Sequence, residues 1–213
     1  MLDPSAAGSR YFGDAVALSA SGETALVGRV ALSSSGPGYV QVFQQAGDGS
    51  WIHQKQLVAP DGVPSLNFGR SVAVSNTGDI ALVGGKKPMG AGASNIGVVH
   101  VFIGAVDGTW SHEAELVDPG AQLWDDNLGS FGDQVALSAD GTTALIGAEF
   151  TKRMIYVCVY TENQVTCSWK ERLAAGMAHV FTRAVDGAWS HQAELPSPTG
   201  GEDQVFGSSV ALS

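Results

Sequence analysis

The chain has 213 residues, enough for one or two domains with a hydrophobic core, and its 28 glycines favour short strands joined by tight turns over long helices. It carries 21 acidic and 11 basic side chains, and the net charge of −10 argues against a nucleic acid or an anionic membrane surface as partner. No apolar segment approaches the roughly 18 residues that a membrane-spanning helix needs, and no signal peptide is visible, so we expect no membrane insertion.

One pattern occurs three times along the chain. Each unit opens with Phe-Gly and reaches a second glycine 16 residues after the Phe, at Phe12–Gly28, Phe68–Gly84 and Phe131–Gly147. A stretch of variable length follows, and then a Val-Phe segment and a Trp-to-Leu segment at constant spacing. Each unit is predicted to form two β-hairpins, because Gly-containing turns between alternating apolar residues favour tight antiparallel pairing. In the second unit the outer hairpin pairs 98–103 with 110–116 across Asp107-Gly108.

Four antiparallel strands per unit predict an all-β fold, a β-propeller built of four-stranded antiparallel blades. The chain would supply about three blades plus partial flanking strands, as one partial propeller over residues 1–213. The predicted repeats are 12–67, 68–130, 131–205 and a partial 206–213, with an insertion at 149–175 in the third repeat. Because an unpaired strand at each end is an exposed edge, we expect a fragment of a larger propeller or a chain that self-associates.

The repeated segments resemble the FG-GAP repeat family, which includes the seven-bladed propeller heads of integrin α subunits and many bacterial cell-surface proteins. Phe-Gly, a strand, a turn, Leu-Val-Gly or Leu-Ile-Gly-Ala and a Val-Phe strand carry the resemblance. It implies adhesion or binding and a secreted or cell-surface location. The Pro of the GAP element is absent. The family's calcium loop is missing too: the connections 19–23, 75–79 and 138–142 are too short and too poor in carboxylates for the six to eight oxygens that calcium takes, so calcium is not carried over.

Length variation among the units falls on one end of the predicted blades. The turns from strand 1 to 2 and from strand 3 to 4 keep a constant length, whereas the 2–3 and 4–1 connections vary. Both variable connections emerge at the same face, and variable loops on a rigid scaffold are where binding specificity is built. We predict a non-enzymatic module that binds a protein or glycan ligand there. The alternatives are an accessory or scaffold propeller of a larger secreted enzyme and a purely structural repeat domain.

Two short segments on that face are candidate ligand-binding sites. The richer one contains Trp124, Asp125, Asp126 and Asn127. An aromatic platform beside acidic groups suits a sugar, a basic peptide or one calcium ion at Asp125 and Asp126; the alternative is a solvated loop whose Trp124 packs against the neighbouring blade. Lys86 and Lys87 lie in a Gly-rich loop of the second unit, where they could pair with an acidic partner or simply be solvated.

The insertion 149–175 has no counterpart in the other units and holds both cysteines. A hairpin that turns at Glu162-Asn163 places Cys158 opposite Cys167 in a non-hydrogen-bonded pair, so a disulfide can form there in an oxidising compartment. Three explanations stay open: a binding hairpin that projects from the ligand face, a neutral insertion, and a translated intron or gene-model error.

No catalytic residue, metal site or cofactor is predicted. His112-Glu113 resembles the start of a zinc-protease HExxH helix, but Leu116 stands where the second histidine would be, and the segment alternates like a strand. The chain has no GxSxG elbow, no P-loop and no Cys/His zinc spacing. The outer hairpins instead predict three opposed polar pairs, His100–Glu115, His179–Glu194 and Gln41–Gln56. For these pairs we favour a structural role over a metal or acid/base role.

Overall fold

The computed structural model describes residues 11–30, 37–60, 67–88, 95–120, 130–149, 152–161, 164–173, 176–198 and 205–213. These ranges form strands and turns and contain no helix. The first blade consists of β1 (Phe12–Leu18), β2 (Thr24–Arg29), β3 (Tyr39–Gln45) and β4 (Trp51–Leu57). The second consists of β5 (Val72–Val74), β6 (Ile80–Pro88), β7 (Asn95–Gly104) and β8 (Trp110–Leu116). The third consists of β9 (Gln134–Leu137), β10 (Thr143–Ala148), β13 (Met177–Arg183) and β14 (Trp189–Pro196).

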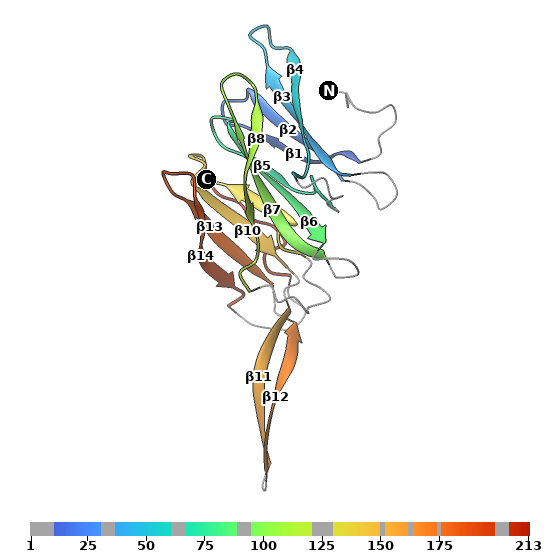
Figure 1. The fold of residues 1–213 in the computed structure, drawn as a ribbon, viewed down its shortest axis with the longest axis vertical. Helices are drawn as coiled ribbons and strands as arrows, with labels where there is room; N and C mark the ends of the chain where they lie inside the picture. Colours follow the sequence, from blue (N-terminus) through green and yellow to red (C-terminus); the bar gives the residue numbers. More distant parts are fainter. Residues whose placement is uncertain are drawn as a thin grey trace.

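Each blade is a four-stranded antiparallel sheet whose strands neighbour one another in chain order. The predicted all-β fold of four-stranded propeller blades is confirmed. The insertion forms a separate hairpin of β11 (Lys152–Thr161) and β12 (Gln164–Leu173), which interrupts the third blade between its second and third strands. Figure 1 shows this hairpin reaching away from the three blades.

The outer hairpin of the second blade closes differently from the prediction. In place of a two-residue turn at Asp107-Gly108, the amide of Ala105 donates to the carbonyl of Thr109, and the amide of Gly108 donates to the carbonyl of Ala105. Gly108 adopts a φ of 82°, which glycine accepts without steric cost. The loop is therefore one residue longer than predicted.

A β-bulge between Val101 and Phe102 compensates for the longer loop. It leaves Glu113 as the extra residue of β8, because Val101 pairs with Ala114 while Phe102 pairs with His112. Beyond the bulge His100 lies opposite Glu115, as predicted. The first and third blades have the same bulge, after Val42 and after Val180.

The hydrophobic core lies between neighbouring blades. One cluster joins the first two blades and contains Leu26, Val40, Val42, Leu57, Phe68, Ala81, Val83 and Phe102. A second joins the second and third blades and contains Ile80, Leu82, Val99, Val101, Leu116, Phe131, Leu137, Ala144, Ile146, Ala148, Met177 and Phe181. Trp110 packs against the first cluster and Leu116 belongs to the second, so both ends of the repeated Trp-to-Leu segment pack between blades.

From the second unit on, the Phe-Gly dipeptide of a unit lies against two glycines of the unit before it. A Cβ atom on Gly84 would overlap the carbonyl oxygen of Gly132, and one on Gly97 would overlap that of Phe131. The same relation joins Gly28 and Gly38 to Phe68-Gly69, and Gly147 and Gly176 to Phe206-Gly207. Only glycine lets two backbones approach this closely.

Apolar side chains at the two outer faces of the stack remain exposed. Leu57 and Leu116, at the ends of β4 and β8, are 2% and 3% exposed, whereas the equivalent Leu195 of β14 is 43% exposed. On the first blade Val16 and Leu18 are 68% and 59% exposed. These faces resemble blade interfaces that have no neighbour within the described residues.

The glycine contact gives a direct test of the packing between blades. We expect Gly84→Ala to lower the free energy of unfolding by about 2–3 kcal/mol, because the new methyl group must displace the backbone of Gly132. Gly47→Ala is the matched control, since no atom lies within 4 Å of its built Cβ, and we expect it to change stability by less than about 0.5 kcal/mol. Denaturant unfolding of both variants measures the difference, and equal stabilities would contradict the packing argument.

Candidate functional site

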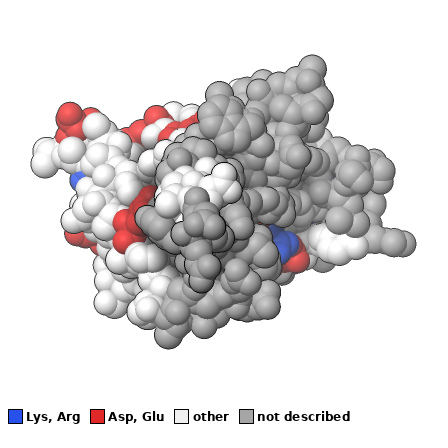
Figure 2. Space-filling view, turned by 90° about the horizontal axis from the view of Figure 1, so that it is seen from below, with Lys and Arg blue, Asp and Glu red and all other residues white. Residues whose placement is uncertain are grey.

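The variable connections leave the blades at the end from which the β11–β12 hairpin projects (Figure 1). The predicted ligand-binding residues Trp124, Asp125, Asp126 and Asn127 belong to one of these connections and lie outside the described residues. Figure 2 shows this end of the molecule, where carboxylates of the described residues gather at one side and basic groups reach the surface in small separate patches.

The prediction that Lys86 and Lys87 lie in a loop is wrong. Both belong to β6, which continues past Gly84 and pairs Lys86 with Gly97 and Lys87 with Ile96 of β7. Lys87 forms an ion pair with Glu115 of the same blade. The strand extends here because the long β6–β7 ladder supplies backbone partners, and the ion pair engages Lys87 within the protein.

Lys86 and Arg70 influence the pKa of Asp133, which lies directly before β9. Burial raises the pKa of Asp133 above its ordinary value, against the opposing charges of Lys86 and Arg70. Arg70 Nε lies 3.2 Å from Asp133 Oδ1. Arg70 and Lys86 of the second blade therefore both act on a carboxylate of the third blade at the junction between them.

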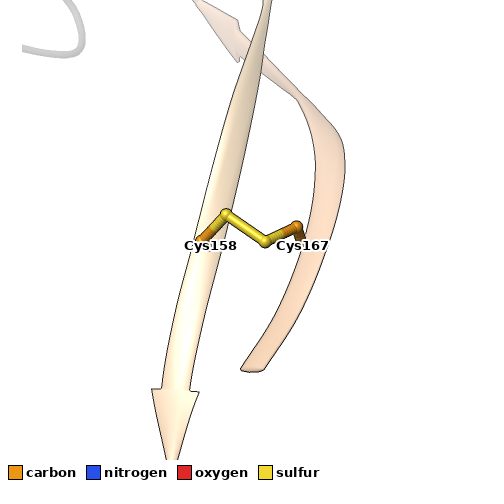
Figure 3. The surroundings of a disulfide bond; sticks show 2 residues. All are labelled: Cys158 and Cys167. Carbon is orange, nitrogen blue, oxygen red and sulfur yellow. A yellow bond between two sulfur atoms is a disulfide. The ribbon is translucent and has the colours of Figure 1, made fainter. Parts of the chain in front are cut away.

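The inserted hairpin pairs in the predicted register. Cys158 lies opposite Cys167, and the two form a disulfide whose Cα atoms are 4.0 Å apart. Figure 3 shows the bond crossing directly from one strand to the other. The cross-link ties together two strands that form a sheet of their own, apart from the three blades.

A cluster of polar side chains lies on the outer hairpin of the second blade. His100 Nδ1 is 3.3 Å from His112 Nε2 and 3.8 Å from Glu115 Oε1. Strict strand alternation would put positions 112 and 115 on opposite faces of β8. The bulge at Glu113 brings both to the face that carries His100, and this is why the sequence prediction missed His112.

The equivalent three positions occur in the other two blades. The third blade has the same residue types as the second, and the first blade has two glutamines in place of a histidine and the glutamate. In the third blade His179 Nδ1 is 3.3 Å from His191 Nε2, and Glu194 lies opposite His179. In the first blade Gln41 donates to Gln56 and contacts the ring of His53 at 2.7 Å. The recurrence of a His two residues after each Trp was the signal in the sequence that could have pointed to these clusters.

The bulge residue itself points the other way, toward the next blade. Glu113 accepts two hydrogen bonds from Arg183, at 3.0 and 2.5 Å, and one from the indole of Trp189 at 3.2 Å. The hydrogen bond from Arg183 holds the pKa of Glu113 below its ordinary value, although partial burial acts in the opposite direction. At the first junction Gln54 accepts from the indole of Trp110 at 3.1 Å.

A groove of about 500 Å³ lies at the first junction, at the end of the blades that carries the constant turns. It is lined by Thr24, Gln44, Gln54, Thr77, Gly78, Asp79, Gly104, Ala105, Val106 and Trp110. Gly104 stands at the position that Arg183 holds in the third blade, so this junction lacks the guanidinium group found at the second.

Comparisons with known proteins agree with the repeat pattern. Residues 51–102 match the family model described as FG-GAP repeat. The match runs from β4 of the first blade to β7 of the second, so the family's unit includes the junction between two blades. No curated protein matches the chain significantly.

Solved structures share the fold at low sequence identity. Hydrazine synthase of Kuenenia stuttgartiensis is 15% identical, with a TM-score of 0.52, and the alignment covers 93% of this chain and 52% of that one. A periplasmic gluconolactonase of Pseudomonas aeruginosa is 12% identical with a TM-score of 0.46, covering 89% and 59%. The chain thus spans between half and three-fifths of the length of these proteins. Within the described residues no helix is long and apolar enough to cross a bilayer.

The contact between Glu113 and Arg183 predicts pH-dependent stability. We expect Glu113→Gln to lower the free energy of unfolding by about 1 kcal/mol at neutral pH, because the group is partly exposed and loses a charge-assisted bond. Since the pKa of Glu113 is lowered on folding, its contribution is present above the unfolded value of 4.5 and is lost as pH falls through the folded pKa. Urea unfolding of both proteins from pH 7 to pH 3 should show the difference between their free energies of unfolding shrinking as the pH falls.

Gln54→Glu is the matched control at the first junction, where Gly104 offers no cationic partner. We expect this variant to gain no stability at neutral pH. Equal stability of wild type and Glu113→Gln at pH 7 would show that the contact between Glu113 and Arg183 contributes nothing.

Proposed function

We propose that this FG-GAP repeat protein is a non-enzymatic binding module, which holds a protein or glycan ligand at the end of the blades that carries the 2–3 and 4–1 connections. The observation that carries the proposal is the division between the two ends. The three blades share strand order, register and outer-hairpin bulge, so they form a rigid scaffold. All length variation, including the β11–β12 hairpin, is confined to the other connections.

The constant turns satisfy their own polar groups. In the second blade Ser75 Oγ accepts from the amide of Ile80 and donates to Asp79 Oδ1. In the third blade hydrogen bonds from Ser138 and from Thr142 hold the pKa of Asp140 below its ordinary value. In both turns one oxygen of the carboxylate accepts hydrogen bonds from groups of its own turn, which supports a structural role for these aspartates.

The charge and the disulfide support the choice of partner and location. With a net charge of −10, the protein suits a neutral or basic ligand better than an acidic one. The disulfide of the hairpin fits an oxidising compartment, which supports a secreted or cell-surface protein. The exposed apolar residues Val16, Leu18 and Leu195 support further blades or a second copy packed against the outer faces.

An alternative of another class is an accessory propeller of a larger secreted enzyme. It is supported by the likeness of this fold to part of hydrazine synthase, at 15% sequence identity. The sequence flanking these residues separates the two: further Phe-Gly units favour a binding propeller, and a neighbouring catalytic domain favours the accessory role.

Trp124→Ala tests the proposed binding face. We expect at least a tenfold loss of affinity, about 1.4 kcal/mol, for whichever ligand a glycan array or a panel of extracellular matrix proteins identifies, because Trp is enriched among the residues that carry most of the binding energy. Val106→Ala, in a fully exposed constant turn at the other end, is the control and should bind like wild type. A Trp124→Ala protein that binds as tightly as wild type would contradict the use of that loop.

A further inference from the structure

We propose that the outer hairpins of the second and third blades each bind one divalent transition-metal ion of the zinc class. The ligands are two imidazoles and one carboxylate in each blade: His100, His112 and Glu115 in the second, and His179, His191 and Glu194 in the third. The donor atoms of each set all lie within 4.8 Å of one another. This inference is independent of the proposed ligand-binding face.

The spacing of the donor atoms fits a metal centre. Zinc binds histidine nitrogen at about 2.0–2.1 Å, so two such ligands in tetrahedral geometry lie about 3.3–3.4 Å apart. The distance between the two ring nitrogens is 3.3 Å in the second blade and again in the third. Glu115 Oε1 lies 3.8 Å from His100 Nδ1, within reach of the same ion after a small side-chain rotation.

The first histidine of each set is held rigidly. His100 is 1% exposed and packs on the ring of Phe68 with centroids 5.4 Å apart; His179 is buried against Phe131 at 5.3 Å. The second histidine and the carboxylate approach from the solvent side, since the side chain of Glu115 is 25% exposed. An ion can therefore enter from solvent and meet a ligand that is already in place.

In the third blade a carboxylate lies near the second ring nitrogen of the first histidine, at a distance longer than a direct hydrogen bond. Ligating histidines usually direct their second ring nitrogen at a carboxylate or carbonyl, which fixes the tautomer and strengthens the ligand. Asp118 Oδ1 lies 3.8 Å from His179 Nε2, on the far side of the ring from His191. The equivalent position before the second blade is Ala59. In the second blade Lys87 instead pairs with the other oxygen of Glu115. This ion pair partly neutralises the carboxylate and weakens its attraction for a cation.

The first blade provides an internal comparison. It has the same bulge and the same three positions, but they hold Gln41, His53 and Gln56. The amides bond to each other and to the imidazole and carry no negative charge. Two imidazoles with a carboxylate suit Zn²⁺, Co²⁺, Ni²⁺ or Cu²⁺, whereas Ca²⁺ and Mg²⁺ prefer sets made wholly of oxygen.

The test is a metal titration of the full chain, freed of any histidine tag and of metal. Calorimetry with Zn²⁺ and absorption spectra with Co²⁺ are expected to give two ions per chain, and Ca²⁺ is expected to give none at these sites. His179→Gln with Glu194→Gln gives the third blade the chemistry of the first, which the fold already accommodates. We expect this protein to bind one ion, the equivalent His100→Gln, Glu115→Gln protein to bind one, and the combination of all four to bind none.

His53→Ala is the control in the first blade and should still bind two ions. Circular dichroism and the unfolding temperature without metal establish that each variant is folded. Where a double variant is not folded, the single substitution of the second histidine in the same blade, His112→Gln or His191→Gln, replaces it. The absence of Zn²⁺ binding by the wild type, or an unchanged stoichiometry in the folded variants, would overturn the proposal. If only one of the two double variants lost an ion, the proposal would be overturned for the other blade.

Asp118→Asn separates a metal role from a purely structural one. We expect the affinity for Zn²⁺ in the third blade to fall about 10–100-fold while the second blade is unchanged, because only His179 has a carboxylate behind it. The Co²⁺ spectrum of the third site should shift with it. Equal affinity at both sites in this variant would show that Asp118 does not support the ligand.

Discussion

The close approach of backbone between blades is the constraint on which the rest of the structure depends. The second, third and fourth Phe-Gly dipeptides each lie against two glycines of the preceding blade, at positions such as Gly84 and Gly97 where no Cβ atom fits. The glycine of the dipeptide has φ near 85° in the last three units, a conformation that other residues rarely adopt. This contact accounts for the constant 16-residue spacing between the Phe of each unit and the glycine of strand 2, because that glycine must lie against the next dipeptide. The backbone contacts set the distance between neighbouring blades, and the large apolar side chains of the two core clusters fill the space between the sheets.

This constraint divides each unit into parts that must repeat and parts that need not. At the two junctions between blades, the inner strands and the Trp-to-Leu segment pack against the neighbouring blade, and the turns between strands 1 and 2 bond to one another. The 2–3 and 4–1 connections vary in length. The hairpin β11–β12 is the extreme case, since it pairs only with itself and depends on its own ladder and the disulfide of Cys158 and Cys167.

Alternation and symmetry were enough to predict the blades, the register of the cysteine pair and the opposition of His100 and Glu115. They failed where the backbone departs from alternation without a change in residue type. The bulge at Glu113 has no glycine or proline to mark it, so alternation alone does not place His112 beside His100. The strand β6 runs past Gly84 to Pro88, and Lys86 and Lys87 were read as loop because they follow the glycine that ends the repeated segment. In both cases tertiary pairing outweighed the local pattern.

The outer hairpins show how a repeated scaffold can carry chemistry that is not repeated in every blade. Near-identity of the Trp-to-Leu segments argued for a structural role, and Trp110 and Leu116 do pack between blades. The bulge that this segment imposes also places three polar positions on one face of each blade. Gln41 and Gln56 fill two of these positions with neutral amides in the first blade, and histidine and glutamate fill them in the other two. The fold therefore supplies the geometry three times, and two side chains per blade decide what that geometry can hold.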